Sequence, residues 1–375
     1  MKITILSAAY PLRGGISHFV GLLYKELSIN HDVNVITFKR QYPSLFFPGK
    51  SQLESGNTVE KIPAEILLDS INPFNWVKVG KKIQKDAPDL LIYKYWMPFF
   101  APCFGTISKI AKKNGKTKIL TICDNVIPHE KKRGDKAMTK YFFRFADYFV
   151  VLSKSVQDDL VKIKPEAKIK FLSHPVYSNF GKPVSKTDAR KFLGLPEDEK
   201  LILFFGFIRE YKGLDILLEA MNILKEKLNV KLVVAGEYYS NEEKYKEIIQ
   251  KLDLKNQLYL FTDFIPTSEV KYYFSAADCV ILPYRDATQS GIVQIAMNFH
   301  KPVIATNVGG LAEVINDNQT GFIIEKENPE ALAEAIEKFY VENKESQFIY
   351  SISNEVNKYS WTNFVAGIIG MVNDI

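Results

Sequence analysis

Cysteine is scarce in this chain, and long apolar runs are missing. Its 375 residues hold three cysteines, Cys103, Cys123 and Cys279, with no Cys-x-x-Cys pair. A zinc site or a disulfide framework is therefore not expected, and a reducing cytoplasm is the expected compartment. No stretch reaches 18 uninterrupted apolar residues, so the sequence predicts no transmembrane helix.

Motifs that would name a cofactor or a nucleic-acid partner are also missing. The first strand-to-helix loop lacks the Gly-x-Gly-x-x-Gly order of a dinucleotide fold, so NAD or FAD binding is not indicated. No RNP, KH or zinc-finger pattern is present, so we expect no nucleic-acid partner. No paired carboxylates stand out that would suit a glycoside hydrolase.

The two halves of the chain differ in charge. Hydrophobic residues make up 46% and charged residues 25%, as in a well-cored globular protein, and the length suggests two domains. Residues 1–180 hold 28 Lys and Arg against 15 Asp and Glu, a net charge of +13, and residues 181–375 hold 21 against 28, a net charge of −7. Opposite signs indicate that the two halves bind different partners.

Short apolar runs alternate with helical patterns from end to end, which is typical of α/β domains with parallel sheets covered on both faces. We expect two doubly wound domains, 1–180 and 181–358, because periodicity breaks at the Pro- and Gly-containing segment 174–188. The expected strands of the first domain are 2–7, 33–38, 90–93, 118–122 and 148–152. Those of the second are 201–205, 230–235, 258–261, 279–282, 303–305 and 322–324.

Four strand-to-helix loops, one in the first domain and three in the second, carry residues that suit phosphate groups. At 11–18, Gly14-Gly15 lets a ligand approach backbone amides at a helix start, although a plain tight turn is the alternative. At 205–213, Arg209 and Lys212 offer two cations at a strand end, a pattern that suits a diphosphate, with a solvated charged loop as the alternative.

The loop 283–291 has small and hydroxyl residues at a helix start, which is typical of an anion site. Gln294, one turn into the helix, is a candidate for a sugar hydroxyl. The segment 307–313 repeats the order of strand, Gly-Gly and helix.

In chain order these motifs resemble those of the family 4 retaining glycosyltransferases, which have the GT-B fold. The resemblance rests on Gly14-Gly15, Arg209…Lys212-Gly213, Gly236-Glu237, Lys301-Pro302-Val303-Ile304-Ala305-Thr306 and Gly309-Gly310-Leu311-Ala312-Glu313. It implies two Rossmann-like domains facing across a cleft, with the closing helix 359–375 crossing back to the first domain.

The resemblance also implies a donor and a reaction. Arg209 and Lys212 would hold the diphosphate of a nucleotide-sugar, the amides around Gln289, Ser290 and Gly291 would hold its distal phosphate, and Gly15 and Glu237 belong to the same donor set. Transfer would follow a front-face substitution in which stabilisation of the leaving diphosphate is the main catalytic effect. Glycosyltransferases of the other main fold hold Mg or Mn on an Asp-x-Asp triplet. None occurs here, so we expect no metal and no cofactor.

Two departures from the family pattern affect the site. Ala287 and Ile295 occupy the positions of the paired glutamates, so Gln294 is our candidate for reading the ribose. The His-Asp pair that often follows an inner strand of the first domain is also altered. There Asp124 ends the strand and the nearest histidine is His129, so these two are the candidate catalytic residues; a plain structural role is the alternative for Asp124.

The basic half carries three lysine clusters, at 78–85, 109–118 and 131–140, near the aromatic stretch 93–100. This pattern favours a peripheral contact with an anionic membrane surface and a glycan or lipid-linked acceptor, as in polysaccharide biosynthesis. A solvated face over a buried aromatic core is the alternative. Two other functions stay open: a nucleotide-sugar epimerase, and a degenerate protein that binds a nucleotide or glycan without turnover.

Overall fold

The computed structural model describes residues 1–43, 53, 61–128, 132–239 and 241–373. The chain divides into two compact units. The first is Met1–Pro175 together with Ser360–Ile375, and the second is Val176–Tyr359. Each unit is built on its own parallel sheet, as the strand–helix alternation predicts.

The sheet of the first unit has the strand order β3-β2-β1-β4-β5-β6-β7 over the described residues, with every pairing parallel. The strands are β1 (Lys2–Leu6), β2 (Asp32–Arg40), β3 (Glu65–Asp69), β4 (Leu90–Tyr95), β5 (Lys118–Cys123), β6 (Tyr148–Val151) and β7 (Ile169–Phe171). Its helices are α1 (Gly15–Ser28), α2 (Pro73–Asp86), α3 (Ala101–Ala111), α4 (Asp135–Phe143), α5 (Lys154–Ile163) and α13 (Trp361–Asn373). The strand order reverses direction between β1 and β4, where ligands of such sheets bind.

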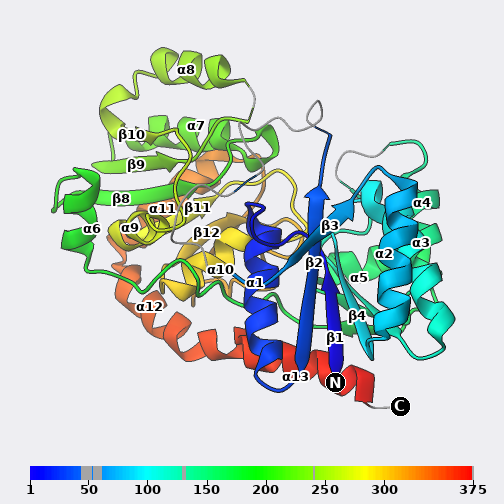
Figure 1. Cartoon of the computed structure of the whole chain (residues 1–375). Coiled ribbons are helices and arrows are strands. Elements are labelled where there is room, and N and C mark those ends of the chain that lie inside the picture. The colour runs from blue at the N-terminus through cyan, green and yellow to red at the C-terminus, as the bar shows by residue number, and fades with distance from the viewer. Residues whose placement is uncertain (44–52, 54–60, 129–131, 240, 374–375) are drawn as a thin grey trace. The chain divides into compact units, whose positions relative to one another are not determined.

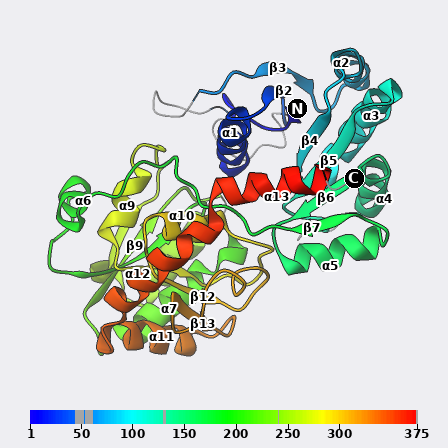
Figure 2. The ribbon, with the colours of Figure 1, turned by 90° about the horizontal axis from the view of Figure 1, so that it is seen from below.

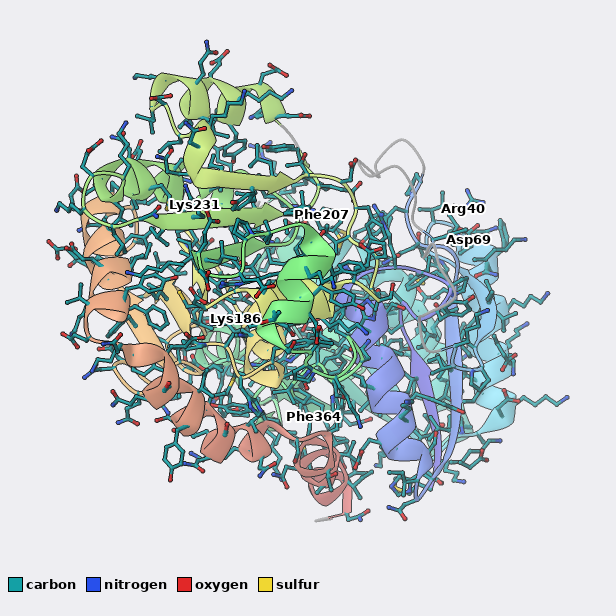
Figure 3. The ribbon with its side chains drawn as sticks, turned by 90° about the vertical axis from the view of Figure 1, so that its left-hand side faces the viewer. Arg40, Asp69, Lys186, Phe207, Lys231 and Phe364 are labelled. Atoms are coloured by element: carbon teal, nitrogen blue, oxygen red, sulfur yellow. The ribbon has the colours of Figure 1, made fainter. Side chains whose placement is uncertain are left out.

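The edge strands β3 and β7 do not appear among the strands that the sequence predicts. β3 is fixed at its end by an ion pair from Arg40 of β2 to Asp69, with Nη2 and Oδ2 2.8 Å apart, and Figure 3 shows the two side chains together. Trp76 of α2 also donates from Nε1 to the Asp69 carbonyl at 2.8 Å. Both strands are short and only partly buried, so their hydrophobic pattern is weak.

The core of the first unit is aromatic. Tyr93, Tyr95, Phe100, Phe104 and Phe142 are fully buried and pack together with ring centroids 4.9–5.7 Å apart in the contacting pairs. The tyrosine hydroxyls are satisfied inside, because Ser108 donates to Tyr93 and Thr139 bonds to Tyr95. Most of the aromatic stretch 93–100 therefore builds the interior, which is the alternative that the sequence left open for it.

The last helix belongs to the first unit. α13 packs along α1 and reaches β6, as Figure 2 shows. Phe19 of α1 makes edge-to-face contacts with Trp361 and Phe364, with ring centroids 4.9 and 5.7 Å apart. Thr362 Oγ1 donates to Glu26 Oε1 at 2.7 Å. No helix in the described part of the chain is long and apolar enough to cross a membrane.

The sheet of the second unit has the order β10-β9-β8-β11-β12-β13, again parallel throughout its described strands. These are β8 (Lys200–Phe205), β9 (Val230–Ala235), β10 (Leu258–Phe261), β11 (Cys279–Leu282), β12 (Val303–Thr306) and β13 (Gly321–Ile324), which confirms the six strands expected from the sequence. Its helices are α6 (Lys186–Leu193), α7 (Leu214–Leu224), α8 (Glu242–Lys251), α9 (Val270–Ala276), α10 (Gly291–Asn298), α11 (Pro329–Val341) and α12 (Lys344–Glu355). Single 3-10 turns cover Pro98–Phe100, Lys112–Asn114, Glu210–Lys212, Lys255–Gln257 and Val356–Tyr359.

A buried carboxylate holds the helices of the second unit to its sheet. Asp278, just before β11, accepts from Lys186 Nζ at 2.7 Å and from Arg190 Nη2 at 3.1 Å, both on α6. It also accepts from the Leu201 amide of β8 and the Tyr340 hydroxyl of α11, each at 2.8 Å. Four donors on one carboxylate offset the cost of burying its charge.

Candidate functional site

The order of the second sheet reverses direction between β8 and β11, so the loops that follow these strands form the expected binding edge. These loops touch backbone to backbone. A Cβ on Gly213 would lie 2.0 Å from the Pro283 carbonyl oxygen, and one on Gly309 would lie 1.6 Å from that of Ala287. Both glycines have positive φ, so only glycine fits the conformation and the space. The loops after β8, β11 and β12 are thereby fixed against one another.

Arg209 and Lys212 lie together on the loop after β8. The guanidinium of Arg209 stacks on the ring of Tyr239, with Cζ 3.6 Å from the ring centroid. Lys212 is only 8% exposed, and its Nζ lies over Gly206, where a Cβ would come within 3.0 Å of it. Burial, and then the charge of Arg209, lower the pKa of Lys212 to about 7. Two cations held this close suit a doubly charged anion.

The third part of this edge is the start of α10. Ser290 caps the helix by accepting from the Ile292 amide at 3.3 Å, and its Oγ lies 3.4 Å from the Tyr284 hydroxyl. Gly291 begins the helix, where the backbone amides and the helix dipole favour an anion. Gln289 lies in the same loop.

Gln294 is 1% exposed, and its Oε1 has no hydrogen-bond partner among the described residues. An amide oxygen buried without a donor costs free energy, which a ligand hydroxyl would recover. Ala287 and Ile295, which the resemblance places at the positions of the paired glutamates, are buried, and each is 5% exposed.

An ion pair that the sequence did not predict holds the loop after β11. Arg285 binds Asp215 of α7 through both Nη atoms, at 2.8 and 3.0 Å, and Lys244 adds a third contact at 3.1 Å. Burial raises the pKa of Asp215, but the hydrogen bonds from Arg285 and Lys244 outweigh it and keep the pKa below its ordinary value. The only signal in the sequence is an acidic residue in the first turn of α7, which is too common to identify a pair.

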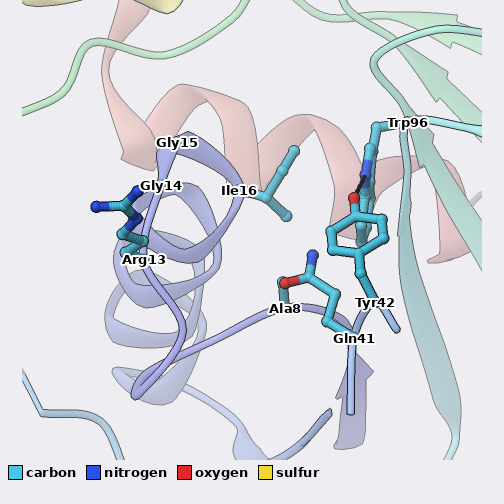
Figure 4. Close-up of a pocket in the computed structure, with 8 residues that line it drawn as sticks. All are labelled: Ala8, Arg13, Gly14, Gly15, Ile16, Gln41, Tyr42 and Trp96. Atoms are coloured by element: carbon cyan, nitrogen blue, oxygen red, sulfur yellow. Dashed lines mark hydrogen bonds between the residues drawn. The ribbon is translucent and has the colours of Figure 1, made fainter. Parts of the chain in front are cut away.

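The first unit has a small pocket at the reversal between β1 and β4. Its volume is about 170 Å³, and its walls are formed by Ala8, Arg13, Gly14, Gly15, Ile16, Gln41, Tyr42 and Trp96. Figure 4 shows the Tyr42 and Trp96 rings as one wall, joined by a 3.0 Å hydrogen bond from Trp96 Nε1 to the Tyr42 hydroxyl, with Gln41 and Ile16 projecting toward the space beside it. An aromatic wall beside polar groups and helix-start amides suits a polar ligand of about one sugar unit.

Asp124, the candidate catalytic carboxylate, directly follows β5 in the first unit. Its Oδ1 lies 2.7 Å from Nζ of Lys94, on β4. The preceding residue, Cys123, is fully buried, and burial raises the pKa of its thiol well above the ordinary range. His129 lies outside the described residues.

The candidate residues therefore fall into two sets. The loops at the binding edge of the second sheet carry Arg209, Lys212, Glu237, Gln289, Ser290, Gly291 and Gln294. Gly15 and Asp124 belong to the first unit. Tyr239, Asp215, Arg285 and Lys94 join these sets from the structure alone. Within the described residues no group of three His, Cys, Asp or Glu side chains is placed to hold a metal ion.

Comparison with known proteins identifies the class. Residues 185–353 match the model of the family described as glycosyl transferases group 1. An uncharacterized glycosyltransferase of Methanocaldococcus jannaschii is 25% identical over 98% of this chain and 97% of its own length. A second one from that organism is 28% identical over 57% of this chain, and the match spans only 56% of that protein. The structure of Anabaena HepE in complex with UDP covers all of both chains with a TM-score of 0.77 at 17% identity.

Each unit is a parallel-sheet Rossmann-like domain, and the fold is similar to that of glycosyltransferases of the GT-B kind. This confirms the fold class that the sequence predicts, and the match over residues 185–353 supports the predicted glycosyltransferase class for the second unit. The second unit carries the group 1 glycosyltransferase domain.

Proposed function

We propose that this protein is a retaining, metal-independent glycosyltransferase that moves a sugar from a nucleoside diphosphate to a hydroxyl of a glycan or lipid-linked acceptor. The donor assignment rests on the pair Arg209 and Lys212 at the reversal point of the second sheet. A Cβ on Gly206 would lie 3.0 Å from Lys212 Nζ and 3.5 Å from Ile292 of α10, so the lysine lies near the start of that helix. The retaining outcome follows from the resemblance of the motifs to family 4.

In the proposed reaction the bond from the anomeric carbon to the diphosphate oxygen breaks, and its electron pair leaves with the diphosphate. The acceptor oxygen forms its bond to the same carbon from the same face, and the acceptor proton passes to the departing phosphate oxygen. Arg209, Lys212 and the amides at the start of α10 stabilise the leaving charge. These fixed donors supply the stabilisation that a metal ion supplies elsewhere.

Gln294 reads the nucleoside in this proposal. It is the buried polar group nearest in sequence to the missing second glutamate, and its Oε1 lacks a donor. A ribose hydroxyl would donate to it. UDP is the first nucleotide to test, because HepE was solved with UDP.

The acceptor is assigned to the first unit, with its pocket of Tyr42 and Trp96 as the site for one sugar unit. A peripheral membrane contact would bring a lipid-linked acceptor there. Six exposed lysines on α2, α3, α4 and the turn after α3 have no ion pair among the described residues: Lys78, Lys81, Lys85, Lys109, Lys113 and Lys140. Phe74, at the start of α2, is 88% exposed, with Ile71 and Val77 beside it in sequence. Figure 1 shows the three helices side by side.

Liposome flotation tests the membrane contact. Each lysine near an anionic surface contributes about 1 kcal/mol, so K78A/K81A/K85A is expected to weaken binding to phosphatidylserine vesicles about 100-fold. The matched control K227A/K251A/K255A removes three exposed lysines from the second unit and should leave binding unchanged. Equal flotation of wild type with and without anionic lipid would contradict the contact.

Transfer is tested by incubating the protein with UDP-, GDP- and ADP-sugars in EDTA and following nucleotide release. Interconversion of the sugar without nucleotide release would favour an epimerase. Tight binding without turnover would favour a degenerate binder, a reading that the missing glutamates keep open.

A further inference from the structure

Arg285 contacts the turn that carries the two cations of the candidate donor site. Its Nη1 donates to the Glu210 carbonyl at 2.8 Å, and its backbone amide donates to the Tyr211 carbonyl at 2.7 Å. Both of these residues lie in the chain between Arg209 and Lys212, in the single 3-10 turn of that loop. Arg285 therefore holds two adjacent carbonyls of the segment that separates the two cations.

The guanidinium of Arg285 is itself held by two carboxylates. Nη1 and Nη2 donate to the two oxygens of Asp215, in the first turn of α7, at 2.8 and 3.0 Å. Nε lies 3.5 Å from Oε1 of Glu327, in the segment between β13 and α11. A planar guanidinium that is paired in this way has a fixed orientation. Because two carboxylates already match its charge, Arg285 is suited to hold the turn and poorly suited to bind a phosphate.

The turn is short and partly exposed. Its own hydrogen bonds run from the Lys212 amide to the Arg209 carbonyl at 3.0 Å and from the Gly213 amide to the Glu210 carbonyl at 3.1 Å. Hydrogen-bond geometry in a 3-10 turn is poorer than in an α-helix. Glu210 and Tyr211 are exposed residues. The two hydrogen bonds from Arg285 therefore add order to a turn that its own bonds hold weakly.

We propose that Arg285 is a positioning residue that holds the turn so that Arg209 and Lys212 reach the donor diphosphate together. The inference rests on the proposed function, because it takes the donor to be a nucleotide-sugar bound at this turn. Ligands that are fixed before binding lose less freedom when the donor arrives, so the affinity is higher. A lysine at position 285 would keep the charge, but it would lack the fork that binds Asp215 and the Glu210 carbonyl at once.

Amide hydrogen exchange tests the contact with the turn without any ligand. In R285M the amides of Lys212 and Gly213 are expected to exchange about tenfold faster, because the turn opens more often. R285K should show the same increase, although its melting temperature should stay closer to that of the wild type because a cation remains beside Asp215. K246M is the matched control. It removes an exposed lysine of α8 that pairs within its own helix, and it should leave exchange unchanged.

Donor affinity is measured for the same variants by calorimetry with UDP, GDP and ADP. R285M and R285K are each expected to raise the Kd of the nucleotide that binds about tenfold, as for the loss of one hydrogen bond to a charged group. K246M should bind as the wild type does.

D215N tests the sign of the effect. On charge alone, removal of an anion from the second unit would tighten the binding of a diphosphate. If Asp215 acts by holding Arg285, the same change should weaken binding, by about threefold.

An R285K protein with wild-type exchange and wild-type Kd would overturn the inference, because a charge at position 285 would then be sufficient. A D215N protein that binds the nucleotide more tightly would also overturn it, because the ion pair would then act through its charge. Unchanged affinity in R285M, in a protein whose wild type binds a nucleotide, overturns the inference alone. A wild type that binds none of the three nucleotides overturns the proposed function, and the inference falls with it.

Discussion

The guanidinium of Arg209 lies over the ring of Tyr239, with Cζ 3.6 Å from the ring centroid. Stacking fixes the plane of the guanidinium and leaves its N–H edge for hydrogen bonds. A lysine at this position would keep the charge but would lose the planar fork and the stack. The contact with Tyr239 therefore restricts Arg209, which the proposed function makes a ligand of the donor diphosphate.

Substitution of Arg209 is expected to weaken donor binding. Hydrogen bonds to a charged group contribute about 1.5–3 kcal/mol, so R209A should raise the Kd for UDP about 10- to 100-fold by calorimetry. R209K should recover only part of the loss. The matched control R144A, an exposed arginine just after α4, should leave the Kd unchanged. Wild-type affinity in R209A would contradict the assignment of the diphosphate to this loop.

The shifted pKa of Lys212 predicts a pH dependence of donor binding. Its pKa is lowered to about 7, so the lysine is charged below pH 7 and neutral above it in the free protein. A diphosphate favours the charged form, and binding above pH 7 must take up a proton. The Kd for a UDP-sugar should therefore rise by up to about tenfold per pH unit between pH 7 and 9. K212M should bind more weakly at pH 6.5 and should show a flat profile.

The same shift affects stability. The unfolded chain holds the Lys212 proton up to about its ordinary pKa of 10.5, whereas the folded protein releases it above about 7. The unfolded state binds more protons in this window, so the free energy of unfolding should rise with pH between 7 and 10.5 through this group. K212M should remove that contribution. A wild-type minus K212M difference that is constant across this window would contradict the shift.

Gln294 is expected to contribute to affinity only when ribose hydroxyls are present. Q294L keeps the size but removes the amide, and it should weaken UDP binding by about 1 kcal/mol, or about fivefold. The same variant should bind 2′,3′-dideoxy-UDP as well as wild type does. Equal losses for the two nucleotides would mean that the leucine disturbs packing around α10 and that Gln294 does not read the ribose.

Removal of the Asp278 carboxylate is expected to destabilise the second unit strongly. D278A leaves Lys186 and Arg190 without their shared anion, with a cost of about 3–5 kcal/mol in the unfolding transition of that unit. The surface pair of Lys162 and Asp159 is the matched control, and D159A should cost at most about 1 kcal/mol. Urea titration followed by fluorescence and circular dichroism checks both values.

The strands of the second unit can be predicted from the sequence more completely than those of the first unit. The six strands of the second sheet are recognisable because each is an apolar run bounded by loop residues, and the start of α11 follows from the Asn328 cap and Pro329. The edge strands β3 and β7 are not predicted because they are short and their polar residues interrupt the hydrophobic pattern.

The side-chain pairs that shape the two candidate sites cannot be predicted from the sequence. Lys94 stands among aromatics in the sequence, where it suggests a basic surface, yet the pairing of β4 with β5 places it in the interior beside Asp124. The partners Arg285 and Asp215 lie 70 residues apart and meet only because α7 follows β8 and β8 pairs with β11. Pairings over such separations depend on register, which a single sequence does not specify.

The most direct test of the account is nucleotide release from UDP-, GDP- and ADP-sugars in EDTA, measured for wild type and for R209A/K212A. The account predicts turnover of at least one donor by the wild type without added metal, and loss of both donor binding and turnover in the double variant. A wild-type protein that neither binds nor cleaves any of these donors, or a double variant with wild-type turnover, would contradict it.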